Sequence, residues 1–176
     1  MPLLILEGPD GSGKSTLAAR LLKGTGHSTL LIKRSGPPND VETLQFQSRW
    51  IANQAKQGLN VIADRHPLIS EAIYAPTVRR VAPPPWSLAD VGVILKKTDV
   101  RVIYCRPSLE ALKRGSRIET QIAGVHDWFM DLVGEYDRWM ITLNEYGVMV
   151  GRYDWEGDVD AYAVTQAVRE YWGMPR

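Results

Sequence analysis

Residues 3–16 read Leu3-Leu4-Ile5-Leu6-Glu7-Gly8-Pro9-Asp10-Gly11-Ser12-Gly13-Lys14-Ser15-Thr16, an apolar run followed directly by the spacing G-x-x-x-x-G-K-S. The apolar run predicts a buried strand, and the residues from Thr16 to Leu22 predict a helix after it. Glycines here allow backbone N–H groups to turn inward around an anion, and the helix N-terminus adds partial positive charge. The segment therefore predicts a site for the phosphates of a nucleoside triphosphate. The alternative is a chance turn rich in glycine and serine.

The candidate nucleotide-binding residues come from this loop. In loops of this type the lysine, here Lys14, reaches the β- and γ-phosphates, and the hydroxyl that follows it, here Ser15, ligates Mg²⁺. ATP and Mg²⁺ are therefore the expected cofactors. The full candidate set is Gly8, Asp10, Gly11, Ser12, Gly13, Lys14, Ser15 and Thr16.

The composition is that of an ordinary globular protein. With 176 residues, of which 44% are hydrophobic and 23% charged, we expect one domain over residues 1–176. No apolar run approaches the roughly 18 residues of a membrane span, and the first residues lack a signal-peptide pattern. The single cysteine, Cys105, fits a reducing cytoplasm and predicts a buried, inert thiol. A net charge of +1 predicts no general affinity for nucleic acid or membrane, and a homodimer is one arrangement that stays open.

Strand patterns alternate with helical patterns along the chain. Further strands are expected at residues 28–33, 61–63, 100–105 and 148–150. Helices are expected from residue 41, with Asp40 as the N-cap, from Pro67, over 87–97, from 108, over 126–144 and over 159–172. Residues 114–124 are polar and predict a flexible segment. This alternation predicts an α/β protein in which helices cover both faces of a parallel sheet.

A second group of chemical interest follows the third strand. Asp64-Arg65-His66 comes at its C-terminal end, where ligands bind in open parallel sheets. Arg65 is therefore a candidate anion-binding residue, and the alternative is a surface arginine paired with Asp64. His66 has no evident partner and is expected to be positional. Trp50 either stacks on a base or packs in the core.

These residues resemble the thymidylate kinases. The loop from Glu7 to Thr16 is similar to the opening of that family, and Asp64-Arg65-His66 with Ser70 and Tyr74 is similar to its Asp-Arg-aromatic segment. The resemblance covers nearly the whole chain and includes viral members of the family. It implies the P-loop fold of nucleoside monophosphate kinases, with a five-stranded parallel sheet ordered 2-3-1-4-5. It also implies phosphoryl transfer from ATP to a nucleotide.

The resemblance implies roles for individual residues. Lys14 and Ser15 would hold the donor phosphates and Mg²⁺, and Asp64 would lie near the metal. Asp10 would face the acceptor, and Arg65 would clamp an acceptor phosphate. Residues 114–124 fall where the family has its lid. Arg114 and Arg117 would close over the transferring phosphoryl group and stabilise its charge, or they belong to a solvated loop.

One segment departs from the family pattern and keeps other functions open. The family places Arg-Glu-Pro-Gly-Gly after the second strand, whereas this chain has Lys33-Arg34-Ser35-Gly36-Pro37-Pro38. We expect a pyrimidine deoxynucleoside monophosphate as the acceptor. One alternative is a modified base in DNA, such as 5-hydroxymethyluracil, contacted by residues 79–86. A DNA acceptor would need several phosphate contacts, which a net charge of +1 supplies poorly. Another alternative is a P-loop NTPase that acts as a switch or motor.

Overall fold

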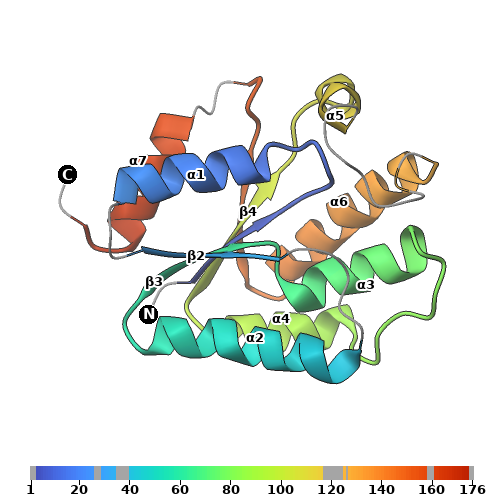
Figure 1. The fold of residues 1–176 in the computed structure, drawn as a ribbon, viewed down its shortest axis with the longest axis horizontal. Coiled ribbons are helices and arrows are strands. Elements are labelled where there is room, and N and C mark those ends of the chain that lie inside the picture. Colours follow the sequence, from blue (N-terminus) through green and yellow to red (C-terminus); the bar gives the residue numbers. More distant parts are fainter. Residues whose placement is uncertain are drawn as a thin grey trace.

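The sheet has the predicted topology. The protein is described by a computed structural model, which covers residues 3–25, 29–34, 40–116, 125, 127–157 and 161–174. Its five strands pair in parallel in the order β2-β3-β1-β4-β5 (Figure 1). The strands are β1 (Leu3–Glu7), β2 (Thr29–Lys33), β3 (Asn60–Asp64), β4 (Val100–Cys105) and β5 (Met149–Tyr153). The predicted order and direction of the strands are therefore confirmed.

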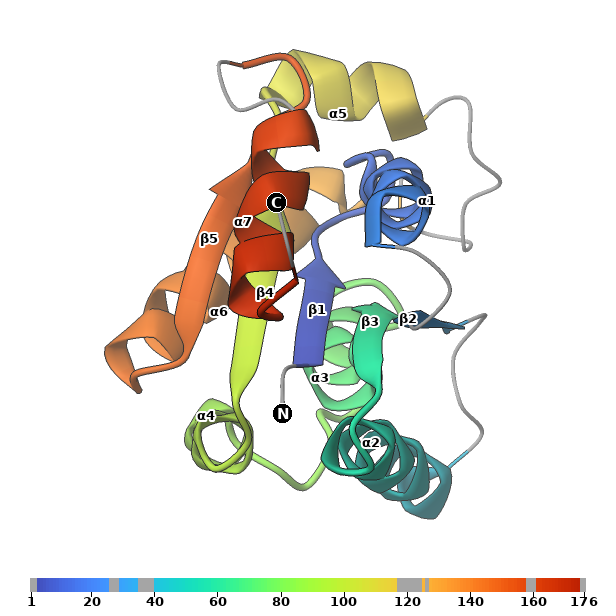
Figure 2. The same ribbon diagram turned by 90° about the vertical axis from the view of Figure 1, so that its left-hand side faces the viewer.

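Helices cover both faces of this sheet. One face carries α1 (Lys14–Thr25) and α7 (Ala161–Tyr171). The other carries α2 (Val41–Lys56), α3 (Pro67–Thr77), α4 (Leu88–Lys96) and α6 (Phe129–Glu145). The short helix α5 (Leu109–Ser116) lies beyond the ends toward which the strand arrows point (Figure 2). This C-terminal edge is the place where open parallel sheets bind ligands.

The core explains why β1 is central. All five of its residues are buried, as expected for a parallel strand with helices on both sides. Leu3 and Ile5 pack in the cluster with α2, α3, α4 and α6, whereas Leu4 and Leu6 pack with α1 and α7. Leu6 pairs with Asp64 of β3. The register therefore places the phosphate loop directly beside the Asp64-Arg65 segment.

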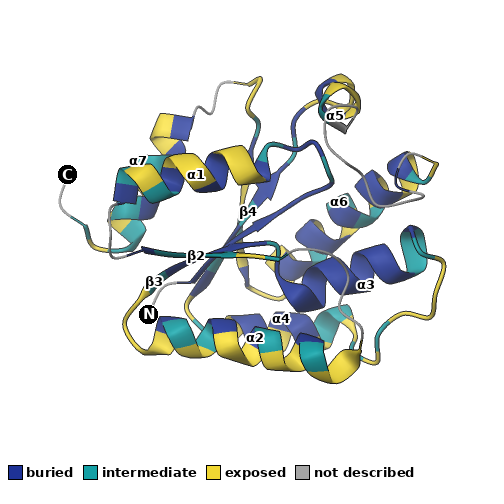
Figure 3. Ribbon diagram, viewed as in Figure 1, coloured by how far each residue is buried: buried dark blue, intermediate teal, exposed yellow. Residues whose placement is uncertain are grey.

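Local signals set most helix starts. The Asp40 side chain accepts a hydrogen bond from the Thr43 backbone N–H at 2.6 Å, so the predicted N-cap of α2 is confirmed. Ser87 and Asp90 form a capping box at α4, and Pro67 opens α3. Residues Pro67 to Ala75 of α3 are all buried (Figure 3). This helix therefore holds its polar side chains inside the protein.

Two boundaries differ from the sequence-based prediction. The last strand extends to Tyr153, because its pairing with β4 continues to Cys105. Helix α5 continues through Arg114 to Ser116, where a flexible segment was expected. Buried Ala111 and Leu112 anchor α5, and basic residues in its last turn favour a helix C-terminus. The rest of the expected lid, residues 117–124, lies outside the described residues.

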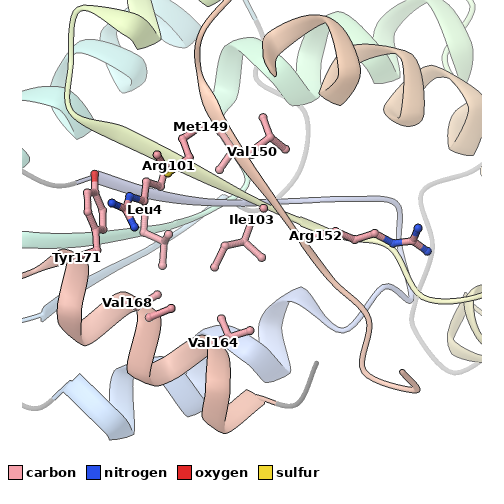
Figure 4. A pocket seen from close by; sticks show the side chains of 12 residues that line it. Leu4, Arg101, Ile103, Met149, Val150, Arg152, Val164, Val168 and Tyr171 are labelled. Atoms are coloured by element: carbon pink, nitrogen blue, oxygen red, sulfur yellow. The ribbon is translucent and has the colours of Figure 1, made fainter. Parts of the chain in front are cut away.

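An apolar groove lies on the face of the sheet opposite to α6. Leu4, Ile103, Val164 and Val168 line this volume of about 240 Å³ between α7 and strands β4 and β5 (Figure 4). Its lining contains no residue of the phosphate loop. Within the described ranges, no helix has the length and apolar character needed to cross a membrane.

Candidate active site

The phosphate loop has the backbone geometry that its glycines predict. Gly8, Gly11 and Gly13 all have positive φ, a region that side chains disfavour. A Cβ at Gly8 would collide with the Cys105 carbonyl oxygen of β4. The loop then enters α1, where the Leu17 backbone N–H donates to the Gly13 carbonyl at 2.9 Å. The loop thus packs tightly against β4 and leads directly into the N-terminus of α1.

The Lys14 ammonium lies inside this loop. Its Nζ donates to the Pro9 carbonyl at 2.6 Å and to the Ser12 hydroxyl at 3.1 Å. Burial, with the nearby Arg65 guanidinium as the next cause, lowers the pKa of Lys14 to about 8. A phosphate entering the loop would supply the negative charge that this buried ammonium lacks.

Ser15 and Asp64, the two expected metal ligands, lie next to each other. The Ser15 Oγ donates to Asp64 Oδ2 at 2.8 Å, which joins the loop to the end of β3. A hydroxyl beside a carboxylate fits Mg²⁺, which binds through one or two protein oxygens together with phosphates and waters. No group of three or more His, Cys, Asp or Glu able to hold a metal ion occurs in the part of the chain that the structure describes. Thr16, next in the loop, is exposed.

Arg65 forms the centre of a second cluster, which faces the loop. Its guanidinium pairs with the Asp10 carboxylate and donates to the Tyr136 hydroxyl at 2.8 Å. Asp10 also accepts a hydrogen bond from Tyr74 at 3.0 Å. Arg65 has φ 74°, a conformation that costs about 1–3 kcal/mol for a non-glycine residue. The alternative of a surface arginine paired with Asp64 is wrong, because the Arg65 side chain is only 15% exposed and pairs with Asp10.

Glu7 supports this cluster from within the core, a role that the sequence analysis missed. Its carboxylate has no exposed surface and accepts hydrogen bonds from the His66 backbone N–H at 2.6 Å, Ser70 at 3.2 Å and Tyr136 at 3.2 Å. Burial raises the pKa of Glu7, and the Arg65 charge opposes that rise. Because Glu7 holds the turn after β3, it fixes the position of Arg65.

His66 is positional, as the sequence predicts. It is buried, its Nε2 lies 3.3 Å from the Ser48 hydroxyl of α2, and burial lowers its pKa to about 3. The neutral ring therefore joins α2 to the turn after β3. Trp50 is 42% exposed on the same helix, so the core-packing alternative for this residue is wrong.

Arg114 and α5 approach the loop from above the sheet edge. A Cβ on Gly115 would lie 2.5 Å from the Gly11 carbonyl oxygen, so the end of α5 touches the loop. Arg114 pairs with Glu156, which also accepts a hydrogen bond from Ser108 at 2.7 Å. Arg114 thus neighbours the residue that touches the loop, but its own side chain pairs with Glu156. Arg117 lies outside the described residues.

The sequence analysis did not predict the positions of two further side chains at this edge, Trp155 and Arg106. Trp155, after β5, lies against the loop, with its Cδ1 3.0 Å from where a Cβ of Gly13 would be. No pattern around Trp155 signals this position, which depends on where β5 ends. Arg106, directly after β4, donates from Nε to the Asp137 carboxylate at 3.0 Å.

Comparisons with known proteins bear on the fold. A scan of protein-family profiles and a search of curated proteins found no match. The YorR protein from Bacillus subtilis, solved in complex with phosphorylated GDP, is 22% identical, with 94% of this chain and 92% of that chain covered and a TM-score of 0.67. Deoxyadenosine kinase from M. mycoides, solved with dCMP and dCDP, is 18% identical, with 98% and 99% covered and a TM-score of 0.61. This chain has the fold of P-loop nucleoside and nucleotide kinases. At these identities the likeness establishes the fold alone.

Proposed function

We propose that this chain transfers a phosphoryl group from ATP to a pyrimidine deoxynucleoside monophosphate. The observation that carries the proposal is the meeting of two clusters at one sheet edge. Lys14, Ser15 and Asp64 form the donor cluster, and Arg65 with Asp10 forms the acceptor cluster. Asp64 and Arg65 are consecutive residues, so the two clusters lie next to each other. Neighbours of this fold that were solved with nucleotides support the same chemistry.

The residues divide the work of transfer between them. Lys14 and the loop N–H groups bind the donor phosphates, and Ser15 and Asp64 would hold Mg²⁺, which neutralises phosphate charge when bound. Arg65 would exchange Asp10 for the acceptor phosphate and orient its oxygen toward the donor. The bond from the γ-phosphorus to the bridging oxygen breaks as the bond to the acceptor oxygen forms. Arg114 and Arg117 are proposed to stabilise the charge that spreads during this step.

The DNA-base alternative receives less support from the contacts of residues 79–86. Arg79 pairs with Glu71, and the Arg80 guanidinium lies 3.6 Å from the centre of the Trp128 ring. The Trp86 indole donates to the Leu68 carbonyl at 3.1 Å. The side chains that would have contacted a DNA strand are thus engaged within the protein.

Radiolabelled ATP tests the proposal directly. The purified chain is incubated with each deoxynucleoside, each deoxynucleoside monophosphate and DNA containing 5-hydroxymethyluracil, and products are separated by thin-layer chromatography. We expect label in the diphosphate of a pyrimidine deoxynucleotide. Label found only in the product of a deoxynucleoside, or only in DNA, would contradict the proposed acceptor and still support phosphoryl transfer from ATP. ATP hydrolysis without transfer to any acceptor would favour a switch or motor NTPase.

The affinity for ATP should fall as the pH rises through about 8. The Lys14 pKa is lowered to about 8, so the ammonium is charged below that pH and neutral above it. Only the charged form attracts phosphates, so the association constant should fall by up to about tenfold per pH unit above 8. Calorimetric titration with a non-hydrolysable ATP analogue between about pH 7.5 and 9.5 measures this slope. A slope that persists in Lys14→Met would assign the titration to another group.

Replacement of Arg114 by alanine should lower kcat and kcat/KM together by about tenfold, with little change in ATP affinity. This pattern is expected for a cation that acts mainly in the transition state. The matched control is Lys113→Ala, which removes an exposed cation from the same helix. Unchanged turnover in Arg114→Ala would return Arg114 to a surface ion pair with Glu156.

A further inference from the structure

The turn after β5 makes contacts that the proposed transfer step leaves unexplained. The chain leaves β5 and reaches α5 beyond the ends of the strands (Figure 2). Asp154 holds the backbone of this turn, because its carboxylate accepts a hydrogen bond from the Glu156 N–H at 3.0 Å and its carbonyl accepts one from the Gly157 N–H at 3.3 Å. Trp155 and Glu156 are consecutive in the turn, and they contact two different parts of the candidate site. The turn therefore joins parts of the site that are far apart in sequence.

Glu156 binds helix α5 at both of its ends. Its Oε2 accepts a hydrogen bond from the Ser108 hydroxyl at 2.7 Å, and its Oε1 pairs with Arg114 in the last turn of the helix. Ser108 also caps α5, because its Oγ accepts a hydrogen bond from the Ala111 backbone N–H at 3.1 Å. One carboxylate thus holds both the start of α5 and the arginine proposed to act on the phosphates.

Trp155 attaches the same turn to the phosphate loop. Its indole lies so close to Gly13 of the loop that a Cβ there would be 3.0 Å from the indole Cδ1. Helix α5 touches the loop as well, where Gly115 meets the Gly11 carbonyl. The loop, α5 and the turn therefore form a closed ring of contacts, and the ion pair of Arg114 is one link of this ring.

The ion pair between Arg114 and Glu156 is better suited to positioning than to stabilising the fold. The two side chains are 59% and 28% exposed, and solvent screens a pair of this kind. An arginine without this partner would sample many rotamers, and holding the side chain in one place in advance favours its use in a reaction. The pair occupies Nη2 of Arg114, and a guanidinium has five N–H donors. The same side chain can therefore bind Glu156 and a phosphate oxygen.

We propose that Glu156 is a positioning residue that fixes α5 and the Arg114 guanidinium beside the phosphate loop. The inference rests on the proposed function and adds a residue that acts through Arg114. A carboxylate repels phosphates, so an effect of Glu156 that favours transfer must pass through the arginine. The loss of Glu156 and the loss of Arg114 should therefore have the same consequence, and the two losses should not add.

A double-mutant cycle tests this coupling. Glu156→Gln should lower kcat by about tenfold, as expected for Arg114→Ala, with little change in the KM for ATP or in the melting temperature. In Arg114→Ala, the further change Glu156→Gln should alter kcat by less than about twofold. Glu156→Asp keeps the charge on a side chain one methylene shorter, so it should lower kcat by an intermediate factor. The control is Glu110→Gln, which removes an exposed carboxylate from α5 and should leave kcat unchanged.

The possible results separate the positioning role from the kinase activity. Unchanged turnover in Glu156→Gln, a loss that Arg114→Ala does not share, or losses that multiply in the double variant would overturn the inference and leave the kinase proposal standing. So would a loss in Glu156→Gln that comes with a large fall in melting temperature. If no acceptor is phosphorylated, the proposed function fails instead. Amide hydrogen exchange then tests the positioning role by itself: α5 should exchange faster in Glu156→Gln than in Glu110→Gln, and equal rates would overturn it.

Discussion

Replacement of Lys14 by alanine is expected to lower the rate of phosphoryl transfer by about 10²–10³, comparable to the loss of one oriented donor that stabilises developing charge. Lys14 lies inside the loop on the Pro9 carbonyl and the Ser12 hydroxyl, where its charge is available to the donor phosphates. The measurement is single-turnover transfer from labelled ATP, with circular dichroism to confirm folding. Lys56→Ala, at an exposed lysine in the last turn of α2, should have no effect.

The fold should survive the loss of Lys14. The ammonium is buried at a lowered pKa, so its removal relieves a desolvation cost while it deletes two hydrogen bonds. We therefore expect a melting temperature close to that of the unaltered chain. Near-normal transfer in a folded Lys14→Ala protein would contradict the assignment of the phosphate loop.

Replacement of Arg65 by alanine is expected to raise the KM for the acceptor by about 10- to 150-fold and to leave the KM for ATP nearly unchanged. A charge-assisted contact of a guanidinium with a phosphate is worth about 1.5–3 kcal/mol, which corresponds to that range. Steady-state kinetics with each substrate varied in turn separates the two constants. Arg65→Lys should recover part of the loss, since it keeps the charge and loses the planar fork.

The control for Arg65 is an arginine in an ion pair elsewhere. Arg138 pairs with Glu135 on α6 and is 61% exposed, so Arg138→Ala should leave both constants unchanged. A rise in the KM for ATP in Arg65→Ala would place Arg65 on the donor side.

Local patterns predicted the fold, which the structure confirms, and the residues proposed to bind the donor phosphates. The proposed phosphate contacts of the loop from Gly8 to Ser15 come from its own backbone, whose glycines have positive φ, so the sequence motif itself predicts the loop geometry. Asp64 follows a strand that pairs with β1, and the parallel order alone brings it to Ser15. Where a site is built from local backbone conformation and from the order of the strands, short stretches of sequence are enough to predict it.

The acceptor half depends on contacts that no local pattern encodes. Arg65 meets Asp10 of the loop after β1 and Tyr136 of α6, both distant in sequence, so one of the two interpretations of Arg65 paired it wrongly with Asp64. Glu71 lies on α3, and the two arginines that pair with it, Arg34 and Arg79, follow β2 and α3 respectively. Trp155 reaches the loop because β5 ends beside it. Contacts of this kind depend on how distant segments of the chain pack together.

The buried Glu7 carboxylate also bears on how the chain folds. Its partners come from the turn after β3, from α3 and from α6, and Tyr136 lies 129 positions away along the chain. In a partly folded chain in which β1 is in place and α6 has not docked, the buried Glu7 carboxylate would lack the hydrogen bond from Tyr136. A buried polar group that loses its partner costs about 1–3 kcal/mol. Such intermediates are disfavoured, so the N-terminal strand and the C-terminal half should gain structure in one cooperative transition. In a Glu7→Gln protein, amide hydrogen exchange should show α6 opening independently of β1.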